Sequence, residues 1–459
     1  MLVTDSEQTQ VSEIMEKNSS DYVKTTEADV PVTQAPETKV YKRRWLVLII
    51  FVLYSASNAM QWIQYSIIAN IVMRYYNVTS FLVNMTSMIY MITYIPLVFP
   101  ASYLLEKFGL RYAVIFGALG TALGSWIKVF SVANDRFWIT FLGQSLVAVS
   151  QTFILSVPAR LAAVWFGPDQ VSSACSIGVF GNQLGIAIGF LFPPMLVENS
   201  SNVCIIEKGL RLMYYIFAIC TTVILLLILL FFKSEPPLPP SPAQAVQKRE
   251  NKESNEKFSH SIKKLFTNIS YLLLLFSYSI NIGIFYAIST LLNQIVLQHF
   301  PGHEQDAGRI GLTIICAGML GSVVCGVLLD KTHKFKETTI GLYTLSLVGM
   351  VIFTFTLNVR SIYVIYLTAG ILGFFMTGYL PVGFEFAVEL TYPEPEGTAA
   401  GVLNAAVQIF GITFTMLYGY LFNIWGDFWA NVALCVTLGF GTLITIVIPN
   451  NLRRQNAKA

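Results

Sequence analysis

Two aromatic residues and two glutamines recur at one spacing and could together hold an organic cation. Trp62 and Tyr286 are 224 residues apart, and Gln183 and Gln408 are 225 apart. Aromatic faces attract a quaternary ammonium, which has no N–H group to donate, by a cation–π interaction worth about 2 kcal/mol or more when desolvated. The glutamines could hydrogen-bond a hydroxyl or amine at the other end of such a molecule. Alternatively, the aromatic residues only pack and the glutamines only join neighbouring helices.

The same offset recurs elsewhere, which indicates that the chain consists of two related halves. The further pairs are Glu106 with Asp330, Pro158 with Pro381, and Arg160 with Glu385, at 224, 223 and 225 residues. The two acids end corresponding apolar segments and are followed by basic residues in short loops. A consistent offset over five pairs argues against coincidence and places the aromatic and glutamine pairs at equivalent positions of the two halves.

Composition predicts that these positions lie inside a membrane. The 459 residues are 54% hydrophobic and 12% charged, whereas a soluble domain carries about 25% charged residues. Twelve apolar segments are each long enough for the roughly 20 residues that cross a bilayer. They cover 45–74, 83–105, 111–131, 137–164, 171–197, 209–232, 265–298, 307–329, 338–358, 361–390, 397–422 and 428–449. With two repeated halves, they predict the all-α major facilitator fold, whose binding site lies near the midplane between two six-helix bundles.

Basic residues predict the topology and the domain boundaries. Lys42–Arg44, the linker bases, Lys331–Lys336 and Arg453–Arg454 all fall on one side of twelve spans, so the positive-inside rule puts that side in the cytoplasm. The opposite side carries two glycosylation sequons, at Asn77 and Asn199. We expect a disordered N-terminus at 1–41, bundles at 42–233 and 265–450, a cytoplasmic linker at 234–264 and a cytoplasmic tail at 451–459.

The charged residues narrow both the substrate and the mechanism. No acidic or basic residue lies near the centre of spans one, two, five, seven, eight or eleven; Lys128 lies toward the outer end of span three. Proton-coupled carriers need a buried titratable relay, so uncoupled transport is favoured, and an anionic substrate is disfavoured. Charged residues at the cytoplasmic helix ends could instead latch the halves in one state. These gating candidates are Glu106, Arg111, Asp330, Arg160, Glu385 and Glu389.

Four long strings resemble the feline leukaemia virus subgroup C receptor family of the major facilitator superfamily. They are Gln61–Tyr65, Phe180–Gly185, Phe285–Asn293 and Gly378–Leu390. The similarity runs from about Tyr41 to Arg454, and the stretch Leu104–Arg111 is most similar to the second vertebrate member. Because the strings are long and specific, the chain is identified as a member of that family.

The resemblance implies facilitated diffusion of choline, and in some members ethanolamine, across the plasma membrane. It maps an aromatic choline cage onto Trp62 and Tyr286, amides onto Gln183 and Gln408, and a span-two lining onto Tyr90 and Met91. Asn70, an amide at depth in span one, is a further substrate-binding candidate. We expect a monomer in the lipid bilayer with a small cationic substrate, no cofactor, no metal, no nucleic acid and no enzymatic activity.

Two alternatives stay open. The family is also described as haem transporters, but the four histidines, His260, His299, His303 and His333, all lie in loops or the linker. A haem site near His299 or His303 is therefore confined to a loop. A protein that only binds a partner, as a receptor or sensor, would show no substrate flux.

Overall fold

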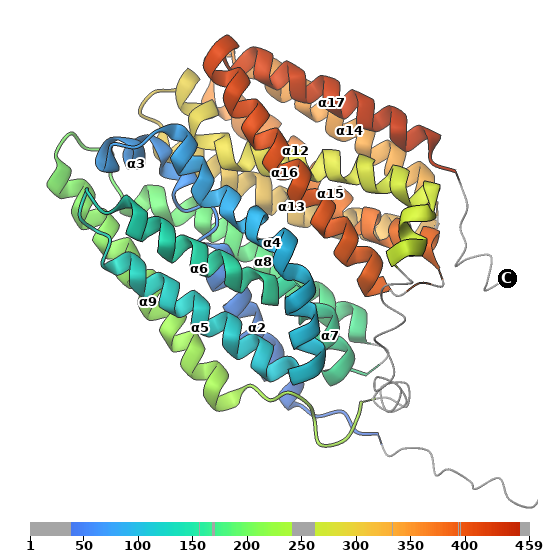
Figure 1. Cartoon of the computed structure of the whole chain (residues 1–459). Coiled ribbons are helices and arrows are strands. Elements are labelled where there is room, and N and C mark those ends of the chain that lie inside the picture. The colour runs from blue at the N-terminus through green and yellow to red at the C-terminus, as the bar shows by residue number, and fades with distance from the viewer. Residues whose placement is uncertain are drawn as a thin grey trace, which may run out of the picture.

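The chain folds into two helical bundles that lie side by side (Figure 1). A computed structural model describes residues 38–155, 157–167, 170–240, 262–332, 334–392, 394 and 396–449, without the side chains at 106, 172, 330, 396 and 397. Residues 1–37 of the expected N-terminal tail, the expected C-terminal tail, most of the linker, His260 and His333 lie outside the described residues.

The first bundle contains spans one to six. Its helices are α2 (Arg43–Ala59), α3 (Ala69–Tyr76), α4 (Ser80–Phe108), α5 (Leu110–Val129), α6 (Phe137–Leu155), α7 (Val157–Trp165), α8 (Val171–Leu196) and α9 (Val203–Phe231). Helices α2 and α3, with the short 3-10 helix η1 (Ser66–Ile68) between them, form span one. Helices α6 and α7 follow one another as span four.

The second bundle contains spans seven to twelve, each a single helix. These are α12 (Ile269–His299), α13 (Glu304–Thr332), α14 (Phe335–Thr356), α15 (Ile362–Thr391), α16 (Glu396–Trp425) and α17 (Asp427–Val447). Eleven helices of the described chain are long and apolar enough to cross a membrane. Span one is absent from that count because its helix is interrupted, and with it the architecture has the twelve spans that the sequence predicts.

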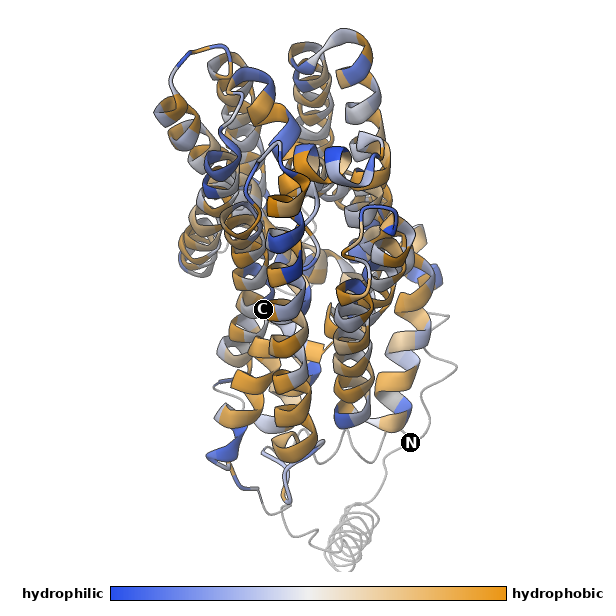
Figure 2. Cartoon of the chain, turned by 90° about the vertical axis from the view of Figure 1, so that its left-hand side faces the viewer, coloured by the Kyte–Doolittle hydropathy of each residue, from blue (hydrophilic) through white to orange (hydrophobic). Residues whose placement is uncertain are grey.

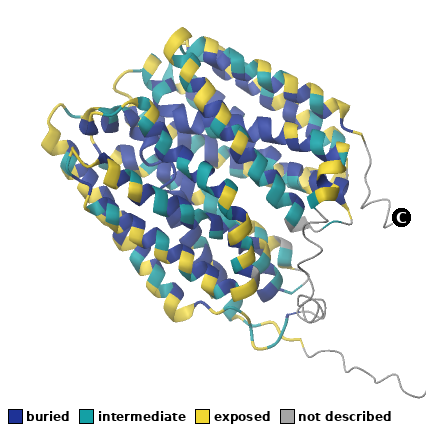
Figure 3. Cartoon of the chain, in the orientation of Figure 1, coloured by how far each residue is buried: buried dark blue, intermediate teal, exposed yellow. Residues whose placement is uncertain are grey.

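Hydrophobic residues predominate along the helices of both bundles (Figure 2). Spans six and twelve, which the sequence predicts to face lipid, leave one apolar stripe exposed, as Leu212, Ile219 and Leu226 on α9 show. These residues are seven apart, two helical turns, so they share one face. The buried residues gather in the interior of the bundles and between them (Figure 3). A bilayer is the solvent that such an exposed apolar surface fits.

The most extensive contacts between the bundles are those of α8 with α13 and of α4 with α16, and span one also contacts α12. Glycines allow the close approach of α8 and α13: a Cβ atom placed on Gly308 would lie 2.5 Å from the Phe190 carbonyl oxygen. Small residues serve the same purpose between membrane helices generally. We call the end of the molecule that carries Asn77 and Asn199 the sequon side, and the end that carries Arg43 and Lys264 the linker side.

Candidate functional site

The aromatic pair is brought together from opposite halves. The indole of Trp62 meets the ring of Tyr286 edge to face, with centroids 5.5 Å apart and an interplanar angle of 66°. Trp62 comes from the interruption of span one, and Tyr286 from the middle of the continuous helix α12. Trp62 is 5% exposed, and Tyr286 is partly buried. The two aromatic residues that the offset pairs are therefore neighbours across the interface between the halves.

This geometry determines where a cation can bind. Edge-to-face rings at 5.5 Å are in direct contact. A cation attracted to an aromatic face lies within about 6 Å of its centroid, and rings in contact leave no room for one between them. In this conformation an ammonium group has to bind beside the pair rather than between the rings. Enclosure of the cation between the two rings requires the rings to separate, which a movement of one half against the other would achieve.

Neighbouring side chains extend the site on the side of α4 and α16. The amide of Gln408, on α16, lies close to the Tyr286 hydroxyl. A Cβ atom placed on Gly411 would lie 2.9 Å from the Met91 sulfur and 3.1 Å from a ring carbon of Tyr286. Met91 therefore borders the aromatic pair, as the resemblance implies, and Gly411 provides the space that both side chains use.

Two other candidates present polar atoms without partners. The hydroxyl of Tyr90 and the Oε1 atom of Gln183 are buried, and neither has a hydrogen-bond partner within the described structure. Buried polar atoms usually have a partner, so such atoms are suited to a ligand. Tyr94, one turn beyond Tyr90 on α4, lies close to both Asn404 and Tyr286. Tyr94 was not predicted, although its spacing of four from Tyr90 places both on one face.

The interruption of span one presents Trp62 without any proline or glycine between Met60 and Tyr65. Side chains of other helices bind the backbone groups that the missing helical turns release. The Gln144 side chain donates to the Gln61 carbonyl oxygen at 2.7 Å, and that of Asn293 donates to the Ile67 carbonyl oxygen at 2.8 Å. Irregular backbone within a membrane requires such partners.

On the sequon side of the aromatic pair, polar side chains join the two halves. Ser87 and Thr290 are 3.0 Å apart, and Gln294 donates to Asn84 at 3.0 Å. We call the whole set the sequon-side cluster, and its members are Asn70, Asn84, Ser87, Asn199, Thr290, Asn293, Gln294 and Glu304. These hydrogen bonds hold the bundles together between the aromatic pair and the sequon side.

Glu304 is central to this cluster, and sequence reasoning missed it. The residue is 8% exposed, and its carboxylate accepts hydrogen bonds from the side-chain amides of Asn70, at 3.0 Å, and Asn199. It stands in the first turn of α13, where the helix dipole favours an anion. Asn70, expected to bind substrate, is instead engaged by Glu304 and Asn293 in this conformation.

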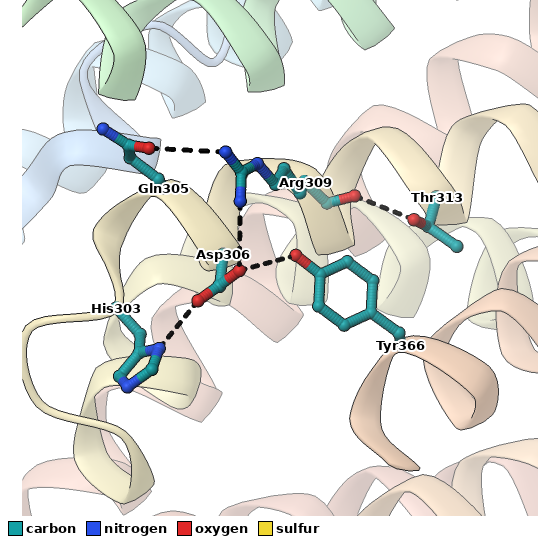
Figure 4. A network of polar contacts seen from close by, with 6 residues as sticks. All are labelled: His303, Gln305, Asp306, Arg309, Thr313 and Tyr366. Carbon is teal, nitrogen blue, oxygen red and sulfur yellow. Dashed lines mark hydrogen bonds and ion pairs between the residues drawn. The ribbon is translucent and has the colours of Figure 1, made fainter. Parts of the chain in front are cut away.

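A second polar network fixes the helix end that carries Glu304 (Figure 4). The Tyr366 hydroxyl, on α15, donates to Asp306 at 2.8 Å, and the same carboxylate lies 2.7 Å from His303 Nδ1. Arg309 approaches Asp306 at 3.6 Å. Because these contacts tie α13 to α15, the first turn of α13 is held in place and Glu304 with it.

Among the gating candidates at the linker side, the described contact of Arg111 lies within one half. Arg111 donates to the Leu229 carbonyl oxygen at 3.1 Å, within its own half. Arg160 is partly buried on α7, Glu385 is exposed and Glu389 is buried, both on α15. The side chains of Glu106 and Asp330 lie outside the description. A latch by these residues stays a prediction for another conformation.

The two sequons differ in their surroundings. Asn77 is exposed, and its backbone is left-handed, with φ 52° and ψ 50°, where it ends α3. Asn199 is also exposed, but its amide nitrogen donates to Glu304 and its oxygen accepts from Arg74 at 2.7 Å. A glycan on Asn77 would meet solvent, whereas a glycan on Asn199 would compete with the sequon-side cluster.

Two bundles related by an internal repeat, with a polar and aromatic site between them, define a membrane transporter of the major facilitator class. The family model of the Major Facilitator Superfamily matches residues 47–415. The structure also resembles a bacterial homologue of the human lysosomal transporter Spinster, in an inward-facing, unoccupied conformation, with a TM-score of 0.69 at 14% identity over 91% of this chain and 99% of that one. At that identity the likeness concerns the fold alone.

Closer relatives define the family within this class. The zebrafish choline/ethanolamine transporter flvcr2b is 50% identical over 96% of this chain and 92% of its own length. Human choline/ethanolamine transporter FLVCR2 is 48% identical over 91% of this chain and 80% of its own. Cat choline/ethanolamine transporter FLVCR1 is 49% identical over 92% of this chain and 75% of its own length. The chain belongs to the feline leukaemia virus subgroup C receptor family, as its sequence strings predict.

Proposed function

We propose that this protein transports choline, and also ethanolamine, by alternating access. The observation that carries the proposal is the contact between Trp62 and Tyr286, which joins the two halves at an aromatic pair. Aromatic faces suit the quaternary ammonium of choline, and the nearby Gln408 amide suits its hydroxyl. The relatives described above are named as choline/ethanolamine transporters, which supports the same substrates here.

The two sides of the aromatic pair have different roles in this proposal. The sequon-side cluster is the external gate, closed in this conformation, and the substrate exchanges on the linker side. Opening of the site toward the sequon side requires the hydrogen bonds that Asn70, Asn199 and Asn293 make between the two halves to break. The ring pair then opens toward the outside. In this conformation the cation binds beside the ring pair, and it becomes enclosed between Trp62 and Tyr286 when the two rings separate.

We propose that the transport is uncoupled. Aromatic rings, amides and a thioether surround the aromatic pair among the described side chains, and none of these changes charge near neutral pH. The cation is therefore held without a counter-ion, and its own gradient drives the flux. Lys128 is buried at the sequon end of span three, but its contacts are glutamines and a tyrosine ring rather than Tyr286.

The proposed orientation puts the linker side in the cytoplasm and the sequon side outside the plasma membrane. Arg43 and Arg44, at the start of α2, and Lys263 and Lys264, before α12, lie on the linker side. Basic residues are retained on the cytoplasmic side of membrane proteins. The exposed Asn77 on the opposite side suits a glycan added in the secretory pathway. We also propose that the protein works as a monomer.

The structure does not favour haem as the substrate. His299, the last residue of α12, lies 2.5 Å from Asp427, and His303 lies 2.7 Å from Asp306, so both histidines are engaged with carboxylates. Neither belongs to the set of side chains around Trp62 and Tyr286. Within the described chain, no group of three or more histidine, cysteine, aspartate or glutamate residues could hold a metal ion.

Uptake of labelled choline into cells tests this proposal. Cells expressing the wild type should accumulate choline above mock cells, while Trp62→Ala and Tyr286→Ala should reduce uptake at equal surface expression. Trp138→Ala is a matched control, because Trp138 is an exposed aromatic residue on α6. Uptake equal to mock cells for the wild type would overturn the function, and a receptor without flux would then be the better description. Wild-type uptake by both variants would overturn the assignment of the cage.

A further inference from the structure

A buried lysine stands beside the interruption of span one. Lys128, in the last turn of α5, is 1% exposed. Its ammonium donates to Gln61 Oε1 at 2.9 Å and to Gln144 Oε1, and it lies 5.7 Å from the centroid of the Tyr65 ring. The described structure places no carboxylate among these contacts. A lysine in this position is costly unless its surroundings supply compensating negative charge.

The interruption itself supplies part of that compensation. Helix α2 ends at Ala59 with Met60 as its C-cap, and Gln61 follows directly. The carboxyl end of a helix carries roughly half a negative charge, and it remains inside the bundle because span one is broken there. Two amide oxygens and an aromatic face complete the surroundings of the ammonium. The charge of Lys128 and the broken helix therefore stabilise each other.

The contacts of Lys128 lie on both sides of Trp62 in the sequence. Gln61 precedes the tryptophan and Tyr65 follows it by three residues. Gln144 connects the same elements again: its nitrogen donates to the Gln61 carbonyl oxygen, and its oxygen accepts from both Lys128 and Gln64. One ammonium group thus holds the two ends of the segment that presents the indole.

The second half lacks this arrangement. The internal offset pairs Gln61, Gln64 and Lys128 with Phe285, Ile288 and Ile352. These residues are apolar, and α12 runs without interruption from Ile269 to His299. Tyr286 therefore needs no such support because a regular helix fixes it. The lysine accompanies the broken span and not the intact one.

We propose that Lys128 is a positioning residue of the binding site, whose ammonium holds the Met60–Tyr65 segment so that the Trp62 indole meets Tyr286. Lys128 acts through the tryptophan and does not touch the substrate. The proposal rests on the proposed function only in its choice of choline as the probe. It also explains why a membrane helix without proline or glycine at its break keeps that break in one geometry.

The first measurement does not depend on choline. Purified Lys128→Met should show faster hydrogen–deuterium exchange in peptides covering Met60–Ile68 than the wild type. Lys208→Met, an exposed lysine near the sequon-side end of α9, is the matched control and should exchange as the wild type does. Gln61→Met, which removes the acceptor and leaves the lysine, provides a second variant and should change exchange in the same direction. Unchanged exchange in both Lys128→Met and Gln61→Met would overturn the proposal.

The second measurement separates positioning from general destabilisation. Lys128→Met should raise the Kd for choline of purified protein about tenfold, corresponding to the loss of a well-placed cation–π contact. In a Trp62→Ala background the same substitution should change Kd by less than about twofold, because no indole remains to be positioned. An equal loss in both backgrounds would overturn the proposal. If the wild type binds no choline, the proposed function fails, while the exchange measurement still decides the role of Lys128.

Discussion

Replacement of Glu304 by glutamine should open the sequon-side cluster. The carboxylate accepts from the amides of Asn70, at 3.0 Å, and Asn199 across the two halves. A hydrogen bond to a charged group contributes about 1.5–3 kcal/mol, against about 0.5–1.5 kcal/mol for a neutral one. Glutamine keeps the shape and one acceptor, so each bond loses about 1–1.5 kcal/mol of its contribution. Removing a partly buried charge also relieves some desolvation, which lowers the net effect.

The net destabilisation of the closed cluster is therefore about 1–3 kcal/mol, which changes a two-state ratio by about 5- to 150-fold. Thr290 offers a position to detect it, because its side chain is fully buried and bonded to Ser87 at the end of the cluster that is nearer the aromatic pair. In a Cys204→Ser background, Thr290→Cys should react slowly with a membrane-impermeant thiol reagent added to intact cells. Adding Glu304→Gln should accelerate the labelling of this cysteine by a factor of about 5 to 150.

The matched control is Glu207→Gln, which removes another carboxylate from the same side of the molecule. Glu207 forms an ion pair with Arg211, four residues along the same helix, so this contact lies within one half. Its loss should therefore leave the labelling rate unchanged. Equal labelling rates with and without Glu304→Gln would refute the reasoning, because the cluster would then not determine access from the sequon side.

Three further predictions follow from contacts described above. Gly411→Ala should raise the KM for choline at normal surface expression, since the added methyl would lie 2.9 Å from the Met91 sulfur. Gly419→Ala on the same helix meets nothing within 4 Å and should leave KM unchanged. Similar KM values for both variants would contradict the placement of Met91 beside the binding site. Gly185→Leu should reduce the amount of folded protein, because a Cβ there already lies 2.4 Å from the Ala56 carbonyl oxygen, and Gly341→Leu, with open space around it, is the control in a detergent-resistant fluorescence assay. Asn77→Gln should abolish the glycosidase-sensitive mobility shift on a gel; a shift that persists would assign the glycan elsewhere.

The sequence was most informative where the internal repeat constrained it. The 224-residue offset paired Trp62 with Tyr286, and their rings are in contact, because equivalent positions of two related bundles face each other across the interface. Hydropathy placed all twelve spans. It did not reveal that span one is broken, since no proline or glycine marks the interruption and side chains of other helices hold it open.

The sequence was least informative for residues whose role depends on partners from other spans. Glu304 stands in an ordinary acidic first turn, and only its contacts with Asn70 and Asn199 distinguish it from Asp306 two residues later. The sequence placed Lys128 toward one end of span three, and it stands in the last turn of α5, but its burial against Gln61 follows from helix packing. Gly411 likewise matters because two side chains from other helices converge on it.

Counterflow in proteoliposomes tests the central claim most directly. Vesicles containing only this protein and unlabelled choline are diluted into labelled choline, with equal pH and equal salt on both sides. An uncoupled carrier that works by alternating access should transiently accumulate labelled choline above its external concentration, and Trp62→Ala should abolish this accumulation. No accumulation by the wild type, or accumulation only with an imposed proton or sodium gradient, would contradict the account.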